Sequence, residues 1–130
     1  MYNEVISQKL GKNTILICTA TGFPAVSVAW QRLDNETGQW NTLLNLKSCE
    51  PTANSRGLCV QRTLVKDDEV ISRLNISHIR RQDFTKFRCL ASNHLGESDA
   101  VVLLQEARAN PYMDLQQLPC QFTNPQMFSR

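Results

Sequence analysis

The sequence predicts an all-β protein: a sandwich of two sheets followed by an irregular C-terminal tail. Three observations predict this class. Short runs of residues alternate between two faces, turn-forming residues separate the runs, and no stretch carries a convincing helical period. With 130 residues, of which 42% are hydrophobic and 20% charged, the chain is long enough for one domain with a real core.

The first two predicted strands span residues 14–20 and 26–33. In the first, Leu16 and Cys18 share one face, whereas Ile15 and Ile17 lie on the other. Residues 11–13 before it and 21–24 after it are turn-forming, because Gly and Asn tolerate positive φ and Pro cannot continue a central strand. The second strand carries Trp30 on one face.

The rest of the domain is predicted as hairpins and one long loop. A polar turn at 34–38 leads to a hairpin partner at 40–44, and residues 45–57 form a long loop. Strands at 58–65 and 70–76 are joined by the charged turn 66–69. A strand at 86–91, a tight turn at 93–96 and a last strand through 100–104 complete the sandwich.

The alternating pattern ends near residue 105, so we predict one domain at 1–106 and a linker or stalk at 107–130. The tail is rich in Pro, Gln and Asn, and its scattered apolar residues could also pack back on the sandwich. The chain starts without the basic flank and apolar core of a signal peptide, and it has no apolar stretch of about 20 residues. We interpret it as a fragment, with any signal peptide and membrane anchor of the parent outside it.

Composition argues against several classes of function. The net charge is +2 with scattered Lys and Arg, which gives no footprint for nucleic acid or an anionic membrane. The five cysteines form no C-x-x-C pair, and His78 and His94 lack metal-ligand spacing to them, so we expect no metal and no cofactor. Neither histidine lies in a nucleophile motif. We therefore expect no enzyme, no catalytic residue and no small-molecule substrate.

Two sequons suit a secreted protein. Asn35-Glu36-Thr37 lies in a predicted turn, and Asn75-Ile76-Ser77 lies in a predicted strand. Both Asn35 and Asn75 are candidate sites for N-linked glycans.

A longer pattern identifies a family. Cys18 and Trp30 are followed by Leu74-x-Ile76-x-x-Ile79, Asp83-x-x-x-Phe87-x-Cys89 and Ala91-x-Asn93-x-x-Gly96. Over about residues 4–106 the chain resembles the immunoglobulin superfamily, its I-set branch in particular. The resemblance implies an immunoglobulin-like sandwich with a disulfide between Cys18 and Cys89, on inward faces of opposite sheets, and an indole packed against it. The core residues that it implies are Leu16, Trp30, Leu74, Ile76 and Phe87.

Two positions depart from the pattern of the family. Thr85 stands where a Gly is usual, and Phe87 stands where a Tyr is usual, so the hydroxyl that closes the tyrosine corner is absent. Many relatives pair an Arg near the start of the fourth strand with the Asp before the second cysteine. Here the candidates are Arg62 and Asp83, with Arg56 as the second choice.

The other three cysteines leave the connectivity open. Cys49 and Cys59 flank a loop rich in Pro, Asn and Gly, which favours a local disulfide. The alternative joins one of them to Cys120 in the tail, because spacing cannot fix connectivity. Otherwise Cys120 is unpaired or forms a disulfide between chains.

The fold carries no chemistry of its own, so function has to come from exposed strands and loops. We expect an extracellular or cell-surface module of an adhesion molecule or receptor, secreted or membrane-anchored, that binds a protein partner homophilically or heterophilically, including as a homodimer. Residues 91–97 resemble neural adhesion molecules and receptor tyrosine kinases. The alternatives are a membrane-proximal domain similar to those of interleukin-one-type receptors and an intracellular structural module of the muscle giant-protein type. The sequons and extra cysteines argue against the intracellular module.

Two surfaces are candidates for partner binding. One is a patch made of Trp40, Leu43 and Leu44, with His94 and Leu95 nearby, because exposed aromatics anchor interfaces. The other is the outward pair Ile15 and Ile17, which are equally well explained as ordinary surface residues. The side chain of Asn75 should point outward from its strand, so a glycan there would block the sheet that contains this strand and favour the opposite sheet as the interface.

Overall fold

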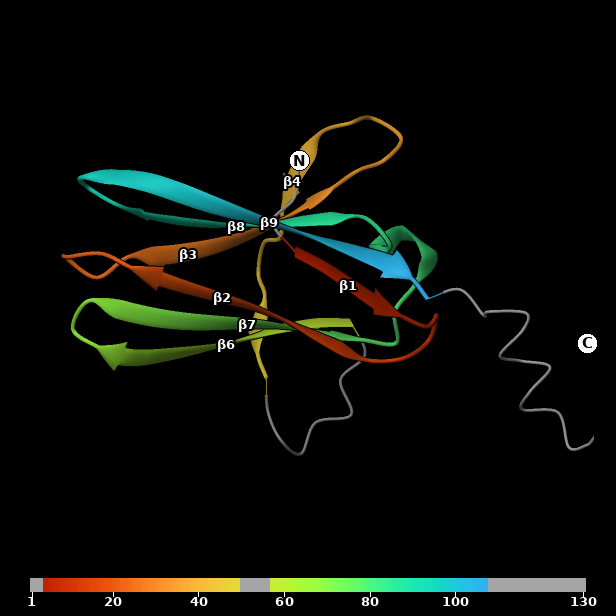
Figure 1. The fold of residues 1–130 in the computed structure, drawn as a ribbon, viewed down its shortest axis with the longest axis horizontal. Helices are drawn as coiled ribbons and strands as arrows, with labels where there is room; N and C mark the ends of the chain where they lie inside the picture. Colours follow the sequence, from red (N-terminus) through yellow and green to blue (C-terminus); the bar gives the residue numbers. More distant parts are fainter. Residues whose placement is uncertain (1–3, 50–56, 108–130) are drawn as a thin grey trace, which may run out of the picture.

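The structure is a computed structural model that describes residues 4–49 and 57–107. Over these residues nine strands and a single 3-10 turn form two facing sheets (Figure 1). One sheet has five strands in the order β1-β9-β8-β3-β4, and the other has four in the order β2-β7-β6-β5. The predicted all-β, two-sheet sandwich is confirmed.

The strands range from 2 to 11 residues, and most of the described pairs are antiparallel. Only β1 with β9 and β5 with β6 run parallel among the described pairs. The elements are β1 (Glu4–Gln8), β2 (Thr14–Thr21), β3 (Ser27–Leu33), β4 (Trp40–Thr42), β5 (Lys47–Ser48), β6 (Gly57–Lys66), β7 (Glu69–Ser77), the 3-10 turn η1 (Arg81–Asp83), β8 (Lys86–Asn93) and β9 (Gly96–Glu106).

The two-residue period of the sequence decides which side chains enter the core. In β2, Leu16 and Cys18 point inward and are buried, whereas the residues between them are exposed. β7 alternates in the same way, and its Leu74 lies directly opposite Leu16. The structure buries all five residues proposed for the core, and none is more than 3% exposed: Leu16, Trp30, Leu74, Ile76 and Phe87.

Two strands have no counterpart among the predicted ones. β1 is half polar and lies at the edge of its sheet, so its alternation is weak. β5 is a strand of two residues inside the predicted long loop. β9 begins at Gly96, earlier than predicted. Gly96 pairs with Asn93, the last residue of β8, in a hairpin whose turn is His94 and Leu95. The predicted division at residues 106 and 107 is untested, since residues 108–130 lie outside the described part.

Candidate functional site

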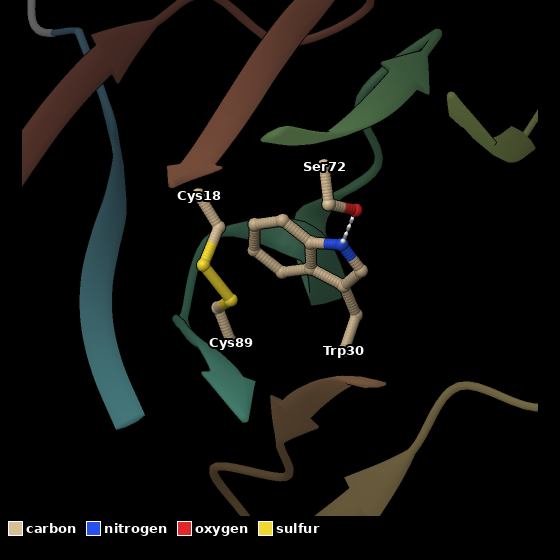
Figure 2. Close-up of a disulfide and its surroundings, with 4 residues drawn as sticks. All are labelled: Cys18, Trp30, Ser72 and Cys89. Carbon is tan, nitrogen blue, oxygen red and sulfur yellow. Dashed lines mark hydrogen bonds between the residues drawn. A yellow bond between two sulfur atoms is a disulfide. The ribbon is translucent and has the colours of Figure 1, made fainter. Parts of the chain in front are cut away.

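The centre of the sandwich is a disulfide between the two sheets. Cys18 comes from β2 in one sheet and Cys89 from β8 in the other, and the structure joins them. Figure 2 shows the indole of Trp30 beside this disulfide. The arrangement agrees with the one that the family resemblance implies, and it ties the two sheets together.

A serine completes this centre and was not singled out in the sequence. The indole Nε1–H of Trp30 donates a hydrogen bond of 2.9 Å to the hydroxyl of Ser72, across from β3 to β7 (Figure 2). Ser72 is 2% exposed and occupies an inward position of its strand. The sequence did carry a signal for this role of Ser72. It is a polar residue at an inward position of a strand, and a buried indole N–H needs an acceptor.

The predicted ion pair between Arg62 and Asp83 is wrong. The carboxylate of Asp83 is bound by Arg32 instead, at 2.9 Å, and it accepts a second hydrogen bond of 2.9 Å from the backbone N–H of Arg80. Arg62 lies on β6 in the other sheet, exposed and opposite Ser72. Arg32 faces Phe87 across β3 and β8, so its guanidinium reaches the turn before β8. The second choice, Arg56, lies outside the described residues.

Thr85, which stands where the family usually has Gly, links two turns. Its hydroxyl lies 2.9 Å from the carbonyl oxygen of Leu33 and 2.9 Å from Oδ1 of Asn35, and it can donate its proton to either. Nδ2 of Asn35 donates to the carbonyl of Phe84 at 3.4 Å. The Asn35 amide, a predicted glycosylation site, therefore also holds the β3–β4 loop against the start of β8.

The second disulfide joins Cys49 to Cys59, which is the local pairing that the sequence favoured. Cys59 lies on β6 between the inward-facing Leu58 and Val60, so its side chain lies on the outer face of the four-stranded sheet. It is nevertheless only 7% exposed. Cys120 lies outside the described residues, and its predicted unpaired or intermolecular state is untested.

The outer face of the five-stranded sheet carries an ordered group, which we call the Arg88 cluster: Trp40, Gln31, Arg88 and Asp99. The guanidinium carbon of Arg88 lies 4.5 Å from the centroid of the Trp40 ring. Its Nε donates a 2.7 Å hydrogen bond to Gln31, and its Nη1 lies 3.9 Å from the Asp99 carboxylate. The cluster spans β4, β3, β8 and β9. Its contacts fix the positions of the Trp40 ring and the Arg88 guanidinium relative to each other.

The structure does not bring the predicted interface residues together. Trp40 lies opposite Leu33 at one end of β3, whereas the turn with His94 and Leu95 lies beyond the other end, next to the β2–β3 loop (Figure 1). Leu43 packs against the core, so it is no part of an exposed patch. The full length of β3 therefore separates Trp40 from the turn that contains His94 and Leu95. Leu44 and Leu95 are exposed, at 75% and 72%.

The described residues contain neither a candidate metal cluster nor a helix suited to span a membrane. No group of three or more His, Cys, Asp and Glu side chains in residues 4–49 and 57–107 could hold a metal ion. No helix within the same ranges has the length and apolar character needed to cross a membrane.

Curated relatives are neural cell adhesion molecules. The chain is 25% identical over 96 residues to neural cell adhesion molecule 1-A of Xenopus laevis, which covers 74% of this chain and 7% of the relative. It is 27% identical over 100 residues to neural cell adhesion molecule 1 of Bos taurus, covering 74% and 9%. The chain thus spans less than a tenth of the relatives' length.

Solved structures share the fold at low identity. The complex of Dpr2 with DIP-Theta matches with a TM-score of 0.61 and 21% identity, covering 81% of this chain and 30% of that one. The first eight immunoglobulin domains of Down syndrome cell adhesion molecule match with a TM-score of 0.59 and 22% identity, over 82% and 14%. A titin I-band fragment matches with a TM-score of 0.58 and 16% identity, over 83% and 31%.

A family model decides the membership. The model described as an immunoglobulin domain matches residues 2–93, which include both members of the central disulfide and the packed tryptophan. The chain belongs to the immunoglobulin domain family.

Proposed function

We propose that this chain is an extracellular recognition domain that binds a protein partner without catalysis, through the outer face of its five-stranded sheet. The observation that carries the proposal is the Arg88 cluster. Trp and Arg are the residues most enriched among interface hot spots. Arg88 and Trp40 are stacked before any partner arrives, so little side-chain entropy remains to be lost on binding.

Several features support the extracellular placement. Disulfides persist in secreted and cell-surface proteins and are rare in the cytosol, and the described residues contain two. The curated relatives are adhesion molecules. The titin match supports the fold alone, and the intracellular structural module is disfavoured by the disulfides. The same similarity supports a membrane-anchored parent, which is part of the proposal.

The partner's contact would include the charged groups around the cluster. Arg88 is 27% exposed and Asp99 is 48% exposed, so both remain available at the surface while their geometry is held. A protein surface that offers a carboxylate to Arg88 and an apolar residue to the free side of the Trp40 ring would complement them. Such contacts desolvate an existing cation–π pair, which strengthens it.

The test uses the secreted 130-residue chain, displayed as multimers on beads. The beads are assayed for self-aggregation and for binding to a panel of immunoglobulin-domain ectodomains. For any binding found, Trp40→Ala and Arg88→Ala should each weaken it by about tenfold or more, equal to about 1.4 kcal/mol. Ile17→Ser on the opposite sheet is the matched control and should leave binding unchanged. Full binding by both cluster variants would contradict the proposed face.

A further inference from the structure

The outer face of the four-stranded sheet exposes apolar side chains on an edge strand. β2 is the first strand of that sheet, and its Ile15 and Ile17 are 48% and 59% exposed. An edge strand with adjacent exposed apolar residues is a template for unwanted association, which natural proteins cover or charge. β2 itself carries no charged side chain on this face, where Ile15 and Ile17 are followed by Thr19 and Thr21.

A sequon asparagine lies directly beside this pair. Asn75 on β7 is the cross-strand partner of Ile15, and Cβ atoms of such partners are about 4.5–5.5 Å apart. Ile17 is its diagonal neighbour, at about 7–8 Å. Ser77, the third residue of the sequon, follows on the same face of the strand.

The amide of Asn75 is held in an unusual state. Its Oδ1 is buried and has no hydrogen-bond partner, the single such side-chain atom in the described part of the chain. Its Nδ2, the atom that N-glycosylation modifies, is not among the buried unpartnered atoms. A buried amide oxygen without a partner costs about 1–3 kcal/mol, so this asparagine is not explained by a structural role. Asn35 differs, because both ends of its amide are bonded within the fold.

The neighbours of Asn75 leave one direction open. On the β6 side its partner is Cys59, which is buried and joined to Cys49. Along the strand, Arg73 turns away toward β6, where Nη1 lies 3.5 Å from the Thr63 hydroxyl. Toward β2, the strand neighbours of Asn75 on this face are the exposed Ile15 and Ile17, so a group attached to Asn75 can extend over them.

We propose that Asn75 carries an N-linked glycan whose first sugars lie over Ile15 and Ile17 and cover the apolar edge of the four-stranded sheet. A bond forms between Nδ2 and the anomeric carbon of N-acetylglucosamine. The bond from that carbon to the diphosphate of a lipid-linked oligosaccharide donor breaks, the lipid diphosphate leaves, and Nδ2 loses one proton. The apolar face of the sugar ring and its N-acetyl methyl group would contact the isoleucine methyl groups.

The inference rests on the extracellular placement proposed above, and the experiment separates the two. The chain is secreted from a glycosylating cell line, and peptide mapping after enzymatic release of N-glycans reports Asn75 as Asp wherever a sugar was attached. Ser77→Ala should abolish modification at Asn75, and Ser77→Thr should retain it. Disulfides and a sugar on Asn35 with Asn75 bare would overturn this inference alone. Free thiols and no sugar in the native protein would overturn both.

The covering role has its own readout. In the glycosylated chain, nuclear Overhauser effects should connect the N-acetyl methyl group of the first sugar with the methyl groups of Ile15 and Ile17. Ser77→Ala should raise the fluorescence of an apolar dye several-fold, and adding Ile15→Ser and Ile17→Ser should reverse the rise. Thr37→Ala, which removes the other sequon, should not change it. A glycan on Asn75 without these contacts, or no rise in Ser77→Ala, would refute the covering role.

Discussion

Three buried polar side chains, Ser72, Asp83 and Thr85, each have a hydrogen-bond partner contributed by β3 or by the turn that follows it. Burying such a group costs free energy unless it is paired, so each pairing specifies where β3 sits against the strands around it. Ser72 positions the indole of Trp30, Asp83 binds the guanidinium of Arg32, and Thr85 holds the carbonyl of Leu33.

The Asp83 pairing gives a prediction at this scale. Arg32→Met should lower the free energy of unfolding by about 3 kcal/mol, because it leaves a buried carboxylate without its cation. Arg62→Met is the matched control and should change stability by less than about 0.5 kcal/mol, because Arg62 is an exposed surface residue. Urea denaturation midpoints of the three proteins test it. Equal losses in both variants would contradict the assignment of Arg32 as the partner.

Among the elements, the start of β8 is tied to the end of β3 and the β3–β4 loop by Thr85. Where a tyrosine hydroxyl would close the corner, the chain has Phe87, which is fully buried. Thr85 instead bonds the β3–β4 loop through Leu33 and Asn35. Thr85 lies two residues from Phe87, so its hydrogen bond keeps the corner tied to a neighbouring element.

Thr85→Val tests this contact, because it keeps the shape of the side chain and removes the hydroxyl. We expect a loss of about 1 kcal/mol or somewhat more, since the one buried donor that reaches the Leu33 carbonyl and the Asn35 amide oxygen is removed. Faster amide hydrogen exchange should be confined to residues 33–39 and 84–86. Thr19→Val, at an exposed position of β2, serves as the control and should show neither effect. If Thr85→Val is as stable as the wild type, the Thr85 hydroxyl does not stabilise the start of β8.

For the whole molecule, the two disulfides act on different scales. Cys18 and Cys89 are 71 residues apart and join the sheets, whereas Cys49 and Cys59 are 10 residues apart and close one loop. In the chain-entropy model the first contributes about 4 kcal/mol and the second about 3 kcal/mol. Loss of the Cys18–Cys89 disulfide also removes its contacts with the indole of Trp30.

Double alanine variants of each pair test this difference. Cys18→Ala with Cys89→Ala should cost more stability than Cys49→Ala with Cys59→Ala, and it should change the fluorescence of the buried Trp30. The second variant should keep the native tryptophan spectrum, because its disulfide lies outside the core. Thermal unfolding followed by tryptophan emission measures both. A larger loss in the Cys49 and Cys59 variant would contradict the central role of the first disulfide.

The sequence by itself determined the strand class, the inward and outward faces of β2 and β7, and the cysteines at the centre, because a period of two and local turn chemistry are written along the chain. The partner of Asp83, the separation of Trp40 from Leu95 and the place of Asn75 beside Ile15 were decided only by the tertiary structure. Each depends on which strands become neighbours and in what register. Residues distant in the chain meet through that pairing, and no local pattern encodes it.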